Sequence, residues 1–312
     1  MTRERTLSIV IPNYNGASVL HRCLDALDGQ TAQADEVIVV DNGSTDGSAQ
    51  AATRGRSLSL ISLSDNRGFG AAANVGVRAC SAEAVAVLNS DARPSAGWVE
   101  RMKQFHRDGA WSWGGVLLDT AGAVESAGDC YSYAGHSYKA LRGADRGQLP
   151  SAPYEVFAVP GAAVVVDRDA FLELGGYRED LFLYYEDIDL AFRAHYAGYT
   201  AWVLPDVFVE HDLAGSSSRR RATYFIARNA VDCYVRHTPE LHARQLLATT
   251  RRELRAARRN GVAGAYVRGR ASAVARLPRS LLGRRRTAEA RGAGVDAATC
   301  ALLPPTATGV GS

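Results

Sequence analysis

The sequence contains no apolar run close to the ~20 residues that a membrane-spanning helix needs. The N-terminal apolar run is too short for a signal peptide and ends without a cleavage-like site. The five cysteines are scattered and none shows the close pairing of a zinc site, so we expect reduced structural thiols. No internal repeat is visible. Together these absences favour a cytoplasmic globular protein.

Lysine is absent from the C-terminal part of the chain, where acidic residues are also scarce. Residues 216–312 contain 19 arginines and five acidic residues, a net charge of +14, whereas residues 1–215 carry a net charge of −11. Such a sharp change predicts a boundary near residue 215. We expect a large domain over 1–215, a basic amphipathic helical region over 216–287, and a disordered Ala/Gly/Thr-rich tail over 288–312.

Short apolar runs alternate with helical patterns through the first part of the chain, which predicts an α/β fold with a parallel sheet. The expected strands are 7–11, 37–40, 58–63, 84–88, 162–166, 202–204 and 207–209. The expected helices are 18–27, 47–54, 70–80, 167–174 and 187–198. Residues 111–150 are irregular and rich in Gly, Ser and Tyr, so we expect loops and an antiparallel insertion there.

Two of the expected strands lead into turn residues that include an aspartate. Asp41 follows the strand at 37–40, and Asp91 follows the strand at 84–88. Ligands of open α/β sheets bind beyond the carboxyl ends of the strands. Carboxylates there suit hydrogen bonding to a base or sugar, or holding a hard cation against phosphates. A turn-forming role would explain one such aspartate, but the second favours a ligand site.

A third acidic group opens the helix expected at 187–198. Glu186 and Asp187 would lie at its N-terminus, where the helix dipole favours acids and also the ionised form that a general base needs. Asp189 is expected to be structural and to pair with Arg193 one turn later. His211 follows a strand-like run and is a candidate metal or phosphate contact.

Residues 68–73 (GFGAAA) support a competing hypothesis. They match the G-x-G-x-x-G/A dinucleotide fingerprint, follow a strand and open a helix, which would indicate an NAD-dependent oxidoreductase. Four residues separate these glycines from the strand, and the hypothesis gives no role to Asp41, Glu186, Asp187 or His211. The small residues would equally permit tight helix–sheet packing.

Five segments together resemble glycosyltransferase family 2, and its bacterial rhamnosyltransferase-like branch is the most similar. They are 8–15 (SIVIPNYN), 39–46 (VVDNGSTD), 66–70 (NRGFG) with Asn74, 88–91 (LNSD) and 184–190 (YYEDIDL). Each is weak alone, but all five in this order are specific. The resemblance covers about residues 6–215 and implies the GT-A nucleotide-diphospho-sugar transferase fold, a mostly parallel central sheet flanked by helices.

The resemblance also implies residue roles. Asp41 would contact the nucleobase of a nucleotide-sugar, and Asp91 would bind Mg²⁺ or Mn²⁺. The family's D-x-D element reads Asn89-Ser90-Asp91 here, so its first acid is missing. Asp187 would be the general base, with Glu186 as the alternative. The full donor-binding set is Pro12, Asn13, Asn15, Asp41, Asn66, Gly68, Asn74, Asn89 and Ser90, and the metal set is Asp91 and His211.

The implied activity is inverting transfer of a sugar, with rhamnose a candidate, from a dTDP- or UDP-linked donor to an acceptor hydroxyl. Cell-surface polysaccharide or glycoconjugate synthesis would be the setting. A catalytically silent GT-A module that binds nucleotide is a third hypothesis. By position, residues 111–160 are expected to shape selection of the sugar or acceptor, through Trp111, Trp113, Tyr131, Tyr133 and His136.

The basic segment 219–286 alternates arginine with apolar residues. Helices packed on the larger domain with solvated arginines would explain this pattern, and so would contact with an anionic membrane surface. No nucleic-acid recognition motif is present, so we expect no nucleic-acid partner. We favour peripheral attachment to the inner face of the cell membrane, which would suit a lipid-linked glycan acceptor.

Overall fold

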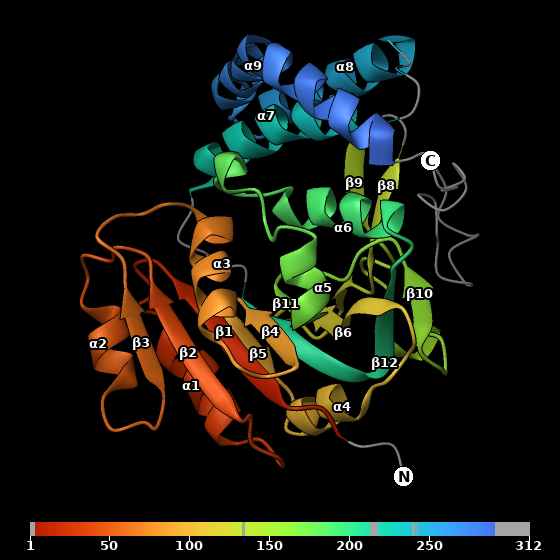
Figure 1. The fold of residues 1–312 in the computed structure, drawn as a ribbon. Helices are drawn as coiled ribbons and strands as arrows, with labels where there is room; N and C mark the ends of the chain where they lie inside the picture. The colour runs from red at the N-terminus through yellow and green to blue at the C-terminus, as the bar shows by residue number, and fades with distance from the viewer. Residues whose placement is uncertain (1–3, 133–134, 213–217, 239–240, 242, 291–312) are drawn as a thin grey trace.

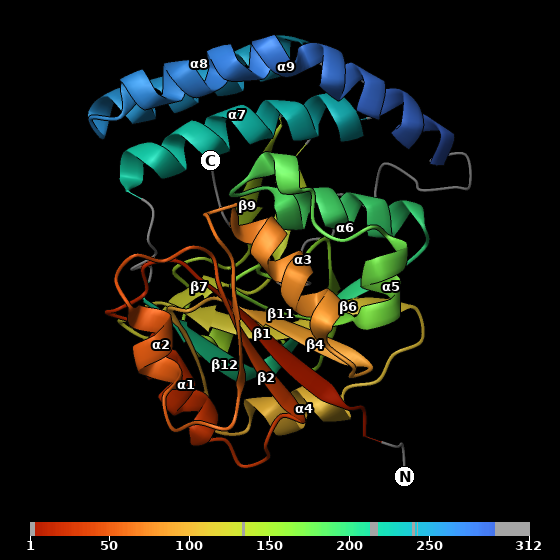
Figure 2. The ribbon, with the colours of Figure 1, turned by 60° about the vertical axis from the view of Figure 1, so that its left-hand side comes forward.

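The computed structural model of the protein describes residues 4–132, 135–212, 218–238, 241 and 243–290. A twisted central sheet carries helices on both faces, and a layer of long helices lies across one end of the molecule (Figures 1 and 2). The expected α/β class is therefore confirmed. Residues 291–312, which include most of the predicted tail, lie outside the described residues.

Ten strands form the central sheet of the described chain. They are β1 Leu7–Asn13, β2 Glu36–Asp41, β3 Ser59–Ser62, β4 Ala84–Leu88, β5 Ala92–Pro94, β6 Ala110–Leu118, β7 Val124–Ser126, β10 Tyr154–Val156, β11 Ala163–Asp167 and β12 Thr200–His211. The main order is β3-β2-β1-β4-β11-β6-β12-β10, with β5 beside β12 and β7 beside β6. The first four strands are parallel, as predicted, whereas β11 runs antiparallel to both neighbours.

In the described chain the first six helices pack on the sheet, and the last three form the layer across one end. The helices are α1 Leu20–Asp28, α2 Ser48–Thr53, α3 Phe69–Ala79, α4 Trp98–Gln104, α5 Arg168–Glu173, α6 Glu186–Tyr196, α7 Arg219–His237, α8 Ala243–Arg259 and α9 Ala263–Ala290, with short 3₁₀ turns at Arg146–Gln148 and Glu179–Leu181. Alternate residues of β1 serve the two faces: Ile9 and Ile11 pack with α1 and α4, while Val10 packs with α3. Both faces of the strand are thus buried, which explains its continuous apolar sequence.

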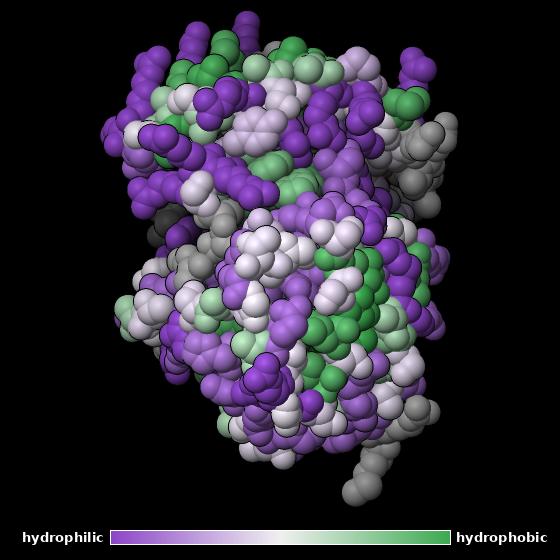
Figure 3. All heavy atoms as spheres, turned by 90° about the vertical axis from the view of Figure 1, so that its left-hand side faces the viewer, coloured by the Kyte–Doolittle hydropathy of each residue, from purple (hydrophilic) through white to green (hydrophobic). Residues whose placement is uncertain are grey.

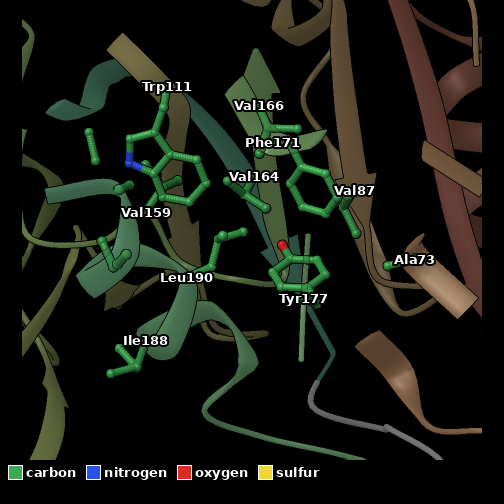
Figure 4. Packing of buried hydrophobic residues seen from close by; sticks show 14 of the residues in the cluster. Ala73, Val87, Trp111, Val159, Val164, Val166, Phe171, Tyr177, Ile188 and Leu190 are labelled. Carbon is green, nitrogen blue, oxygen red and sulfur yellow. The ribbon is translucent and has the colours of Figure 1, made fainter. Parts of the chain in front are cut away.

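The core beneath α5 and α6 sets the position of the α6 N-terminus. Figure 4 shows the rings of Phe171 and Tyr177 together beside Val87, with Leu190 of α6 nearby. The two rings meet edge to face with centroids 5.1 Å apart. Leu190 is fully buried, so α6 cannot turn about its axis without exposing apolar surface.

The expectation of loops over 111–150 was wrong in part. Residues 110–118 form β6, a fully buried strand inside the sheet. Gly114 and Gly115 make this strand hard to predict from the sequence, because glycine is depleted in strands. A Cβ on Gly114 would lie 2.6 Å from a Val159 methyl, and one on Gly115 would lie 2.6 Å from the Val207 carbonyl, so both positions need glycine for close approach.

The antiparallel insertion expected in this stretch is present as the hairpin of β8 (Asp129–Ser132) and β9 (His136–Lys139). The strands expected separately at 202–204 and 207–209 are one strand, β12, whose pairing with β6 shifts register between Leu204 and Phe208. Trp111, Trp113 and Tyr131 lie in the core, which corrects their expected role in substrate selection; Tyr133 lies outside the described residues.

Helix α7 holds the segment that precedes α6. The Asn229 side-chain amide donates hydrogen bonds to the carbonyls of Leu181, Leu183 and Tyr184 at 2.8–3.0 Å. Within this segment Phe182, Tyr184 and Tyr185 have φ values of 66–73°, which are strained for residues with a Cβ. The buried Asn229 amide therefore stabilises a backbone shape that the local sequence disfavours.

The packing of α3 on the sheet generates a stability prediction. A Cβ on Gly76 would lie 2.2 Å from one Val10 methyl and 3.1 Å from a Val40 methyl. We expect Gly76→Ala to lower the free energy of unfolding by about 1–3 kcal/mol through overpacking, although alanine favours helix. Urea unfolding measures the change. Gly264→Ala in α9, where no atom lies within 4 Å of the added Cβ, is the matched control and should be neutral or slightly stabilising; equal losses in both variants would contradict this packing.

Candidate functional site

A cavity of about 770 Å³ opens at the carboxyl ends of β1, β2 and β4. This is the edge at which open α/β sheets bind ligands, and the volume suits a small organic molecule. Ten of the residues expected to act at the site line this cavity. They are Pro12, Asn13, Asn66, Gly68, Asn89, Ser90, Asp91, Glu186, Asp187 and His211.

Three expected donor contacts, Asn15, Asp41 and Asn74, are not among the lining residues. Asp41 accepts a hydrogen bond from the backbone N–H of Ser44 at 3.1 Å. The Asn15 side chain accepts one from the backbone N–H of Thr45 at 2.9 Å. These two contacts shape the loop after β2.

The Asn74 amide is occupied by a different segment. It donates to the Tyr177 carbonyl at 2.8 Å and accepts from the Tyr177 N–H at 2.9 Å. This pair of bonds fixes α3 against the chain that leads to α6. Next to Asp41, Asn42 does line the cavity, and its side chain donates to the Gly68 carbonyl at 3.0 Å.

Glu186 and Asp187 begin α6, and both are buried against the cavity wall. Burial and the neighbouring Asp187 raise the pKa of Glu186 to about 8. Burial and Asp129 raise the pKa of Asp187, while Lys139 opposes that rise and leaves it at about 6. The expected helix-terminus effect is thus outweighed by desolvation. Both pKa values are raised, and the larger rise at Glu186 favours Asp187 as the acid of the pair that ionises first.

The surroundings of the two acids match this distribution of charge. Asp187 accepts a hydrogen bond from the Ile188 N–H at 2.8 Å. Within the described residues one Glu186 carboxyl oxygen is buried without a hydrogen-bond partner, which is tolerable for a neutral acid. A Cβ on Gly161 would lie 2.8 Å from an Asp187 oxygen, so glycine there leaves room for the carboxylate.

Asp91 and His211 meet on another wall of the cavity. The His211 Nε2 lies 3.2 Å from Asp91 Oδ1, and its Nδ1 lies 2.8 Å from Glu125 Oε2. Burial alone would lower the pKa of His211, but hydrogen bonds to the two carboxylates raise it to about 9. Glu125 was not expected from the sequence, because its segment shows no clear strand pattern.

Asp91 and His211 fit a divalent cation, which would take the place of the proton on His211 Nε2. Their carboxylate and imidazole donors are of the kinds that Mn²⁺ and related metals accept, and both residues line the cavity. No cluster of three or more His, Cys, Asp or Glu side chains suited to a metal occurs in the described part of the chain. Two protein ligands leave coordination positions for phosphate oxygens and water.

The hairpin β8–β9 contributes a second unexpected pair. Lys139 Nζ lies 3.0 Å from Asp129 Oδ2, and both residues line the cavity near Asp187. Asp189, by contrast, turns away from the cavity. It forms the expected ion pair with Arg193 at 2.9 Å and also contacts His237 of α7 at 2.9 Å.

The glycines of the dinucleotide-like motif contact protein rather than an open phosphate cradle. A Cβ on Gly68 would lie 2.3 Å from the Phe182 carbonyl oxygen, and one on Gly70 would lie 3.0 Å from the Tyr177 Cβ. The Phe69 N–H at the start of α3 donates to the same Phe182 carbonyl at 2.8 Å. This close packing argues against the oxidoreductase hypothesis.

Comparison with known proteins agrees with this geometry. Residues 8–122 match the sequence profile of Glycosyl transferase family 2. The chain belongs to glycosyltransferase family 2. It is 29% identical over 257 residues to the N-acetylglucosaminyl-diphospho-decaprenol L-rhamnosyltransferase of Mycobacterium tuberculosis, an alignment covering 72% of this chain and 81% of that protein.

A further relative supports the assignment to glycosyltransferase family 2, and a solved structure supports the fold. The pre-mycofactocin glycosyltransferase of Mycobacterium tuberculosis is 31% identical over 237 residues, which cover 73% of this chain and 46% of that protein. The solved structure of the mannosyltransferase PcManGT from Pyrobaculum calidifontis, in complex with GDP-Man and Mn²⁺, has a TM-score of 0.53 at 19% identity. The superposition covers 93% of this chain and 86% of the mannosyltransferase chain, and this likeness shows the GT-A fold.

The charges around Asp187 in this glycosyltransferase generate a titration prediction. Asp129→Asn removes a negative neighbour and should lower the pKa of Asp187 below about 6, whereas Lys139→Met removes a positive neighbour and should raise it. Carbon-13 NMR of protein labelled at aspartate carboxyl groups reports the change. Lys103→Met is the control, because Lys103 pairs with Asp35 instead. Shifts of the same sign in the two test variants would contradict the arrangement.

Proposed function

We propose that the protein is an inverting glycosyltransferase that moves a sugar from a nucleotide-diphosphate donor to an acceptor hydroxyl. The observation that carries the proposal is the single cavity shared by Asp187, which is ionised at neutral pH, and by Asp91 with His211. A base for the acceptor and a charged anchor for a diphosphate are the two groups that this reaction needs. The silent-module hypothesis gives no reason for a buried, ionised Asp187.

The proposed reaction uses groups of this chain at each end of the transferred sugar. Asp187 accepts the proton of the acceptor hydroxyl while that oxygen forms a bond to the anomeric carbon. The bond from the anomeric carbon to the diphosphate oxygen breaks, and its electron pair leaves with the nucleoside diphosphate. Attack from the side opposite the leaving group inverts the configuration.

The remaining groups prepare the two reactants. Pro12, Asn13 and Asn66, together with Asn42, would hold the nucleotide beside the sheet, with Asp41 positioning the loop next to it. A Mg²⁺ or Mn²⁺ ion held by Asp91 and His211 would offset the charge that grows on the departing diphosphate. Glu186, neutral at pH 7, keeps a second charge away from Asp187.

The relatives suggest the finer identity of the substrates. The mycobacterial relative is named as a rhamnosyltransferase acting on a decaprenol-linked glycan. By analogy we propose a dTDP- or UDP-linked donor, with rhamnose as the leading sugar, and a lipid-linked glycan acceptor at the inner face of the cell membrane. Synthesis of a cell-surface polysaccharide or glycoconjugate would be the setting.

A donor panel tests the proposal. The purified chain is incubated with dTDP-rhamnose, UDP- and GDP-sugars in the presence of Mn²⁺, and released nucleoside diphosphate is measured. One donor class should be consumed above the rest. Nucleotide binding without turnover of any donor, given an extract of lipid-linked glycans as acceptor, would favour the silent module, and stabilisation by NAD(H) alone would favour the oxidoreductase.

The assignment of the base gives a direct prediction. Asp187→Asn should lower kcat about 10²–10⁴-fold with little change in the donor KM, because the proton acceptor is lost and donor contacts remain. In the wild type, kcat/KM should fall as pH drops through about 6, where Asp187 becomes protonated. Glu186→Gln imitates a residue that is already neutral and should keep most activity. If Glu186→Gln abolished turnover and Asp187→Asn did not, the roles would be exchanged.

The contact between Glu125 and His211 gives a second prediction. A carboxylate that accepts the Nδ1–H of a metal-binding histidine directs Nε2 toward the metal. Glu125→Gln should therefore weaken Mn²⁺ binding about 10–100-fold, as measured by electron paramagnetic resonance of free Mn²⁺. The control is Glu210→Gln, the neighbour of His211 that is exposed and pairs with Arg93 at 2.7 Å. Equal Mn²⁺ affinities for the two variants would remove Glu125 from this role.

A further inference from the structure

The outer helices α8 and α9 form the face of the molecule that is farthest from the central sheet. Figure 2 shows α7 between the sheet side and these two helices, which extend along it. The Ser280 hydroxyl of α9 bonds to Asp232 of α7, and Gly269 lies against the Tyr224 backbone. Within the described residues no helix is long and apolar enough to cross a bilayer. Any membrane contact of this layer is therefore made from its surface.

The solvent side of α9 carries an apolar stripe. Val267, Ala271, Val274, Pro278 and Leu281 follow one another at spacings of four, three, four and three residues, which places them on one helical face. All five are exposed, and Val274 is 62% exposed. A soluble surface rarely keeps a row of apolar side chains along a helix without a partner.

Arginines surround this stripe. Residues 243–290 contain 13 arginines, no lysine and two glutamates, a net charge of +11. In the part of the chain that the structure describes, none of Arg251, Arg255, Arg258, Arg259 and Arg268 takes part in an ion pair, and all are exposed. Figure 3 shows long hydrophilic side chains projecting beside apolar ones over the helical layer.

We propose that the outward face of α8 and α9 is a docking surface for an anionic lipid membrane. An apolar row inserts at the boundary of headgroups and acyl chains, and flanking cations bind acidic headgroups, so both features of the face are used at once. Charge complementarity favours this partner over a second copy of the chain, whose equal face would bring two such positive surfaces together. Ala271 and Pro278 also offer little for a helix–helix seam.

The same layer reaches the cavity from its inner side. Arg221 of α7, Glu253 of α8 and His136 of β9 line the cavity, and Arg252 lies 3.3 Å from the His136 ring. Helix α8 therefore lines the cavity on its inner side and contributes to the proposed docking surface on its outer side. This step rests on the proposed function, because docking would place a lipid-linked acceptor at the same end of the molecule as the cavity.

Flotation of the full chain with vesicles tests the docking surface. The wild type should float with phosphatidylcholine vesicles that contain phosphatidylglycerol and not with phosphatidylcholine alone. Arg251→Glu with Arg258→Glu should weaken this binding about thirtyfold or more. Arg54→Glu with Arg107→Glu changes the net charge equally, at exposed positions beside α2 and α4, and should not weaken it comparably. Val267→Ser, Val274→Ser and Leu281→Ser together should weaken it at least about tenfold.

Three outcomes would overturn the inference. They are failure of the wild type to float, equal floating with both kinds of vesicle, and equal losses in the two arginine pairs. A dimer in light scattering that the serine variant dissociates, without vesicle binding, would assign the face to a second copy. Salt-sensitive binding to duplex DNA without vesicle binding would assign it to nucleic acid. Donor turnover without membranes is measured in parallel: turnover without floating defeats this inference alone, and floating without turnover defeats the proposed function alone.

Discussion

The site depends on a backbone shape that only tertiary contacts can hold. Phe182, Tyr184 and Tyr185 adopt positive φ, which costs of order 1–3 kcal/mol each, immediately before α6. Asn229 of α7 binds three carbonyls of this segment, and the Asp189 carboxylate joins α6 to Arg178 and His237. Arg193, His237 and Arg178 outweigh the effect of burial and hold the pKa of Asp189 well below its usual range, so these contacts persist at neutral pH. Because of them, α6 begins where Glu186 and Asp187 reach the cavity, which makes α7 a structural part of the site.

The ionisable groups of the cavity form two clusters on different walls. Asp187 lies near Lys139, which limits the rise in its pKa, and Glu186 stays neutral beside it. On another wall, His211 stands between Asp91 and Glu125, and the two carboxylates favour a positive charge between them. The proposed reaction creates negative charge on a diphosphate and releases one proton from an acceptor. A metal ion held by Asp91 and His211 at one wall and a base at another would therefore serve the two ends of that reaction.

The local sequence was enough to predict which residues lie at the ends of strands and at the start of α6. Asp91 follows a periodic segment and the acids at 186–187 begin one, so the elements that carry them could be predicted. Glu125, Asp129 and Lys139 could not, because they come from strands of only three or four residues, which are too short to show a clear period. Asp41 ends β2 as predicted; its carboxylate accepts a hydrogen bond from the following loop, and the neighbouring Asn42 lines the cavity. Strand periodicity predicts the edge of the sheet at which a residue lies, whereas the direction of its side chain depends on loop contacts.

Arginines on the inner side of the helical layer and arginines on its outer side have different surroundings. Arg178 and Arg236 bind Asp232 on the inner side of the helical layer, and Arg276 of α9 reaches Asp180. These arginines stabilise the fold, because removing one of them would leave a buried or half-buried carboxylate unpaired. Arg251, Arg255, Arg258, Arg259 and Arg268 form no ion pair within the described residues, and like charges on one face repel one another. An anionic surface would neutralise these arginines beside the apolar row and so relieve their mutual repulsion. The relief of that repulsion would then contribute to the free energy of docking.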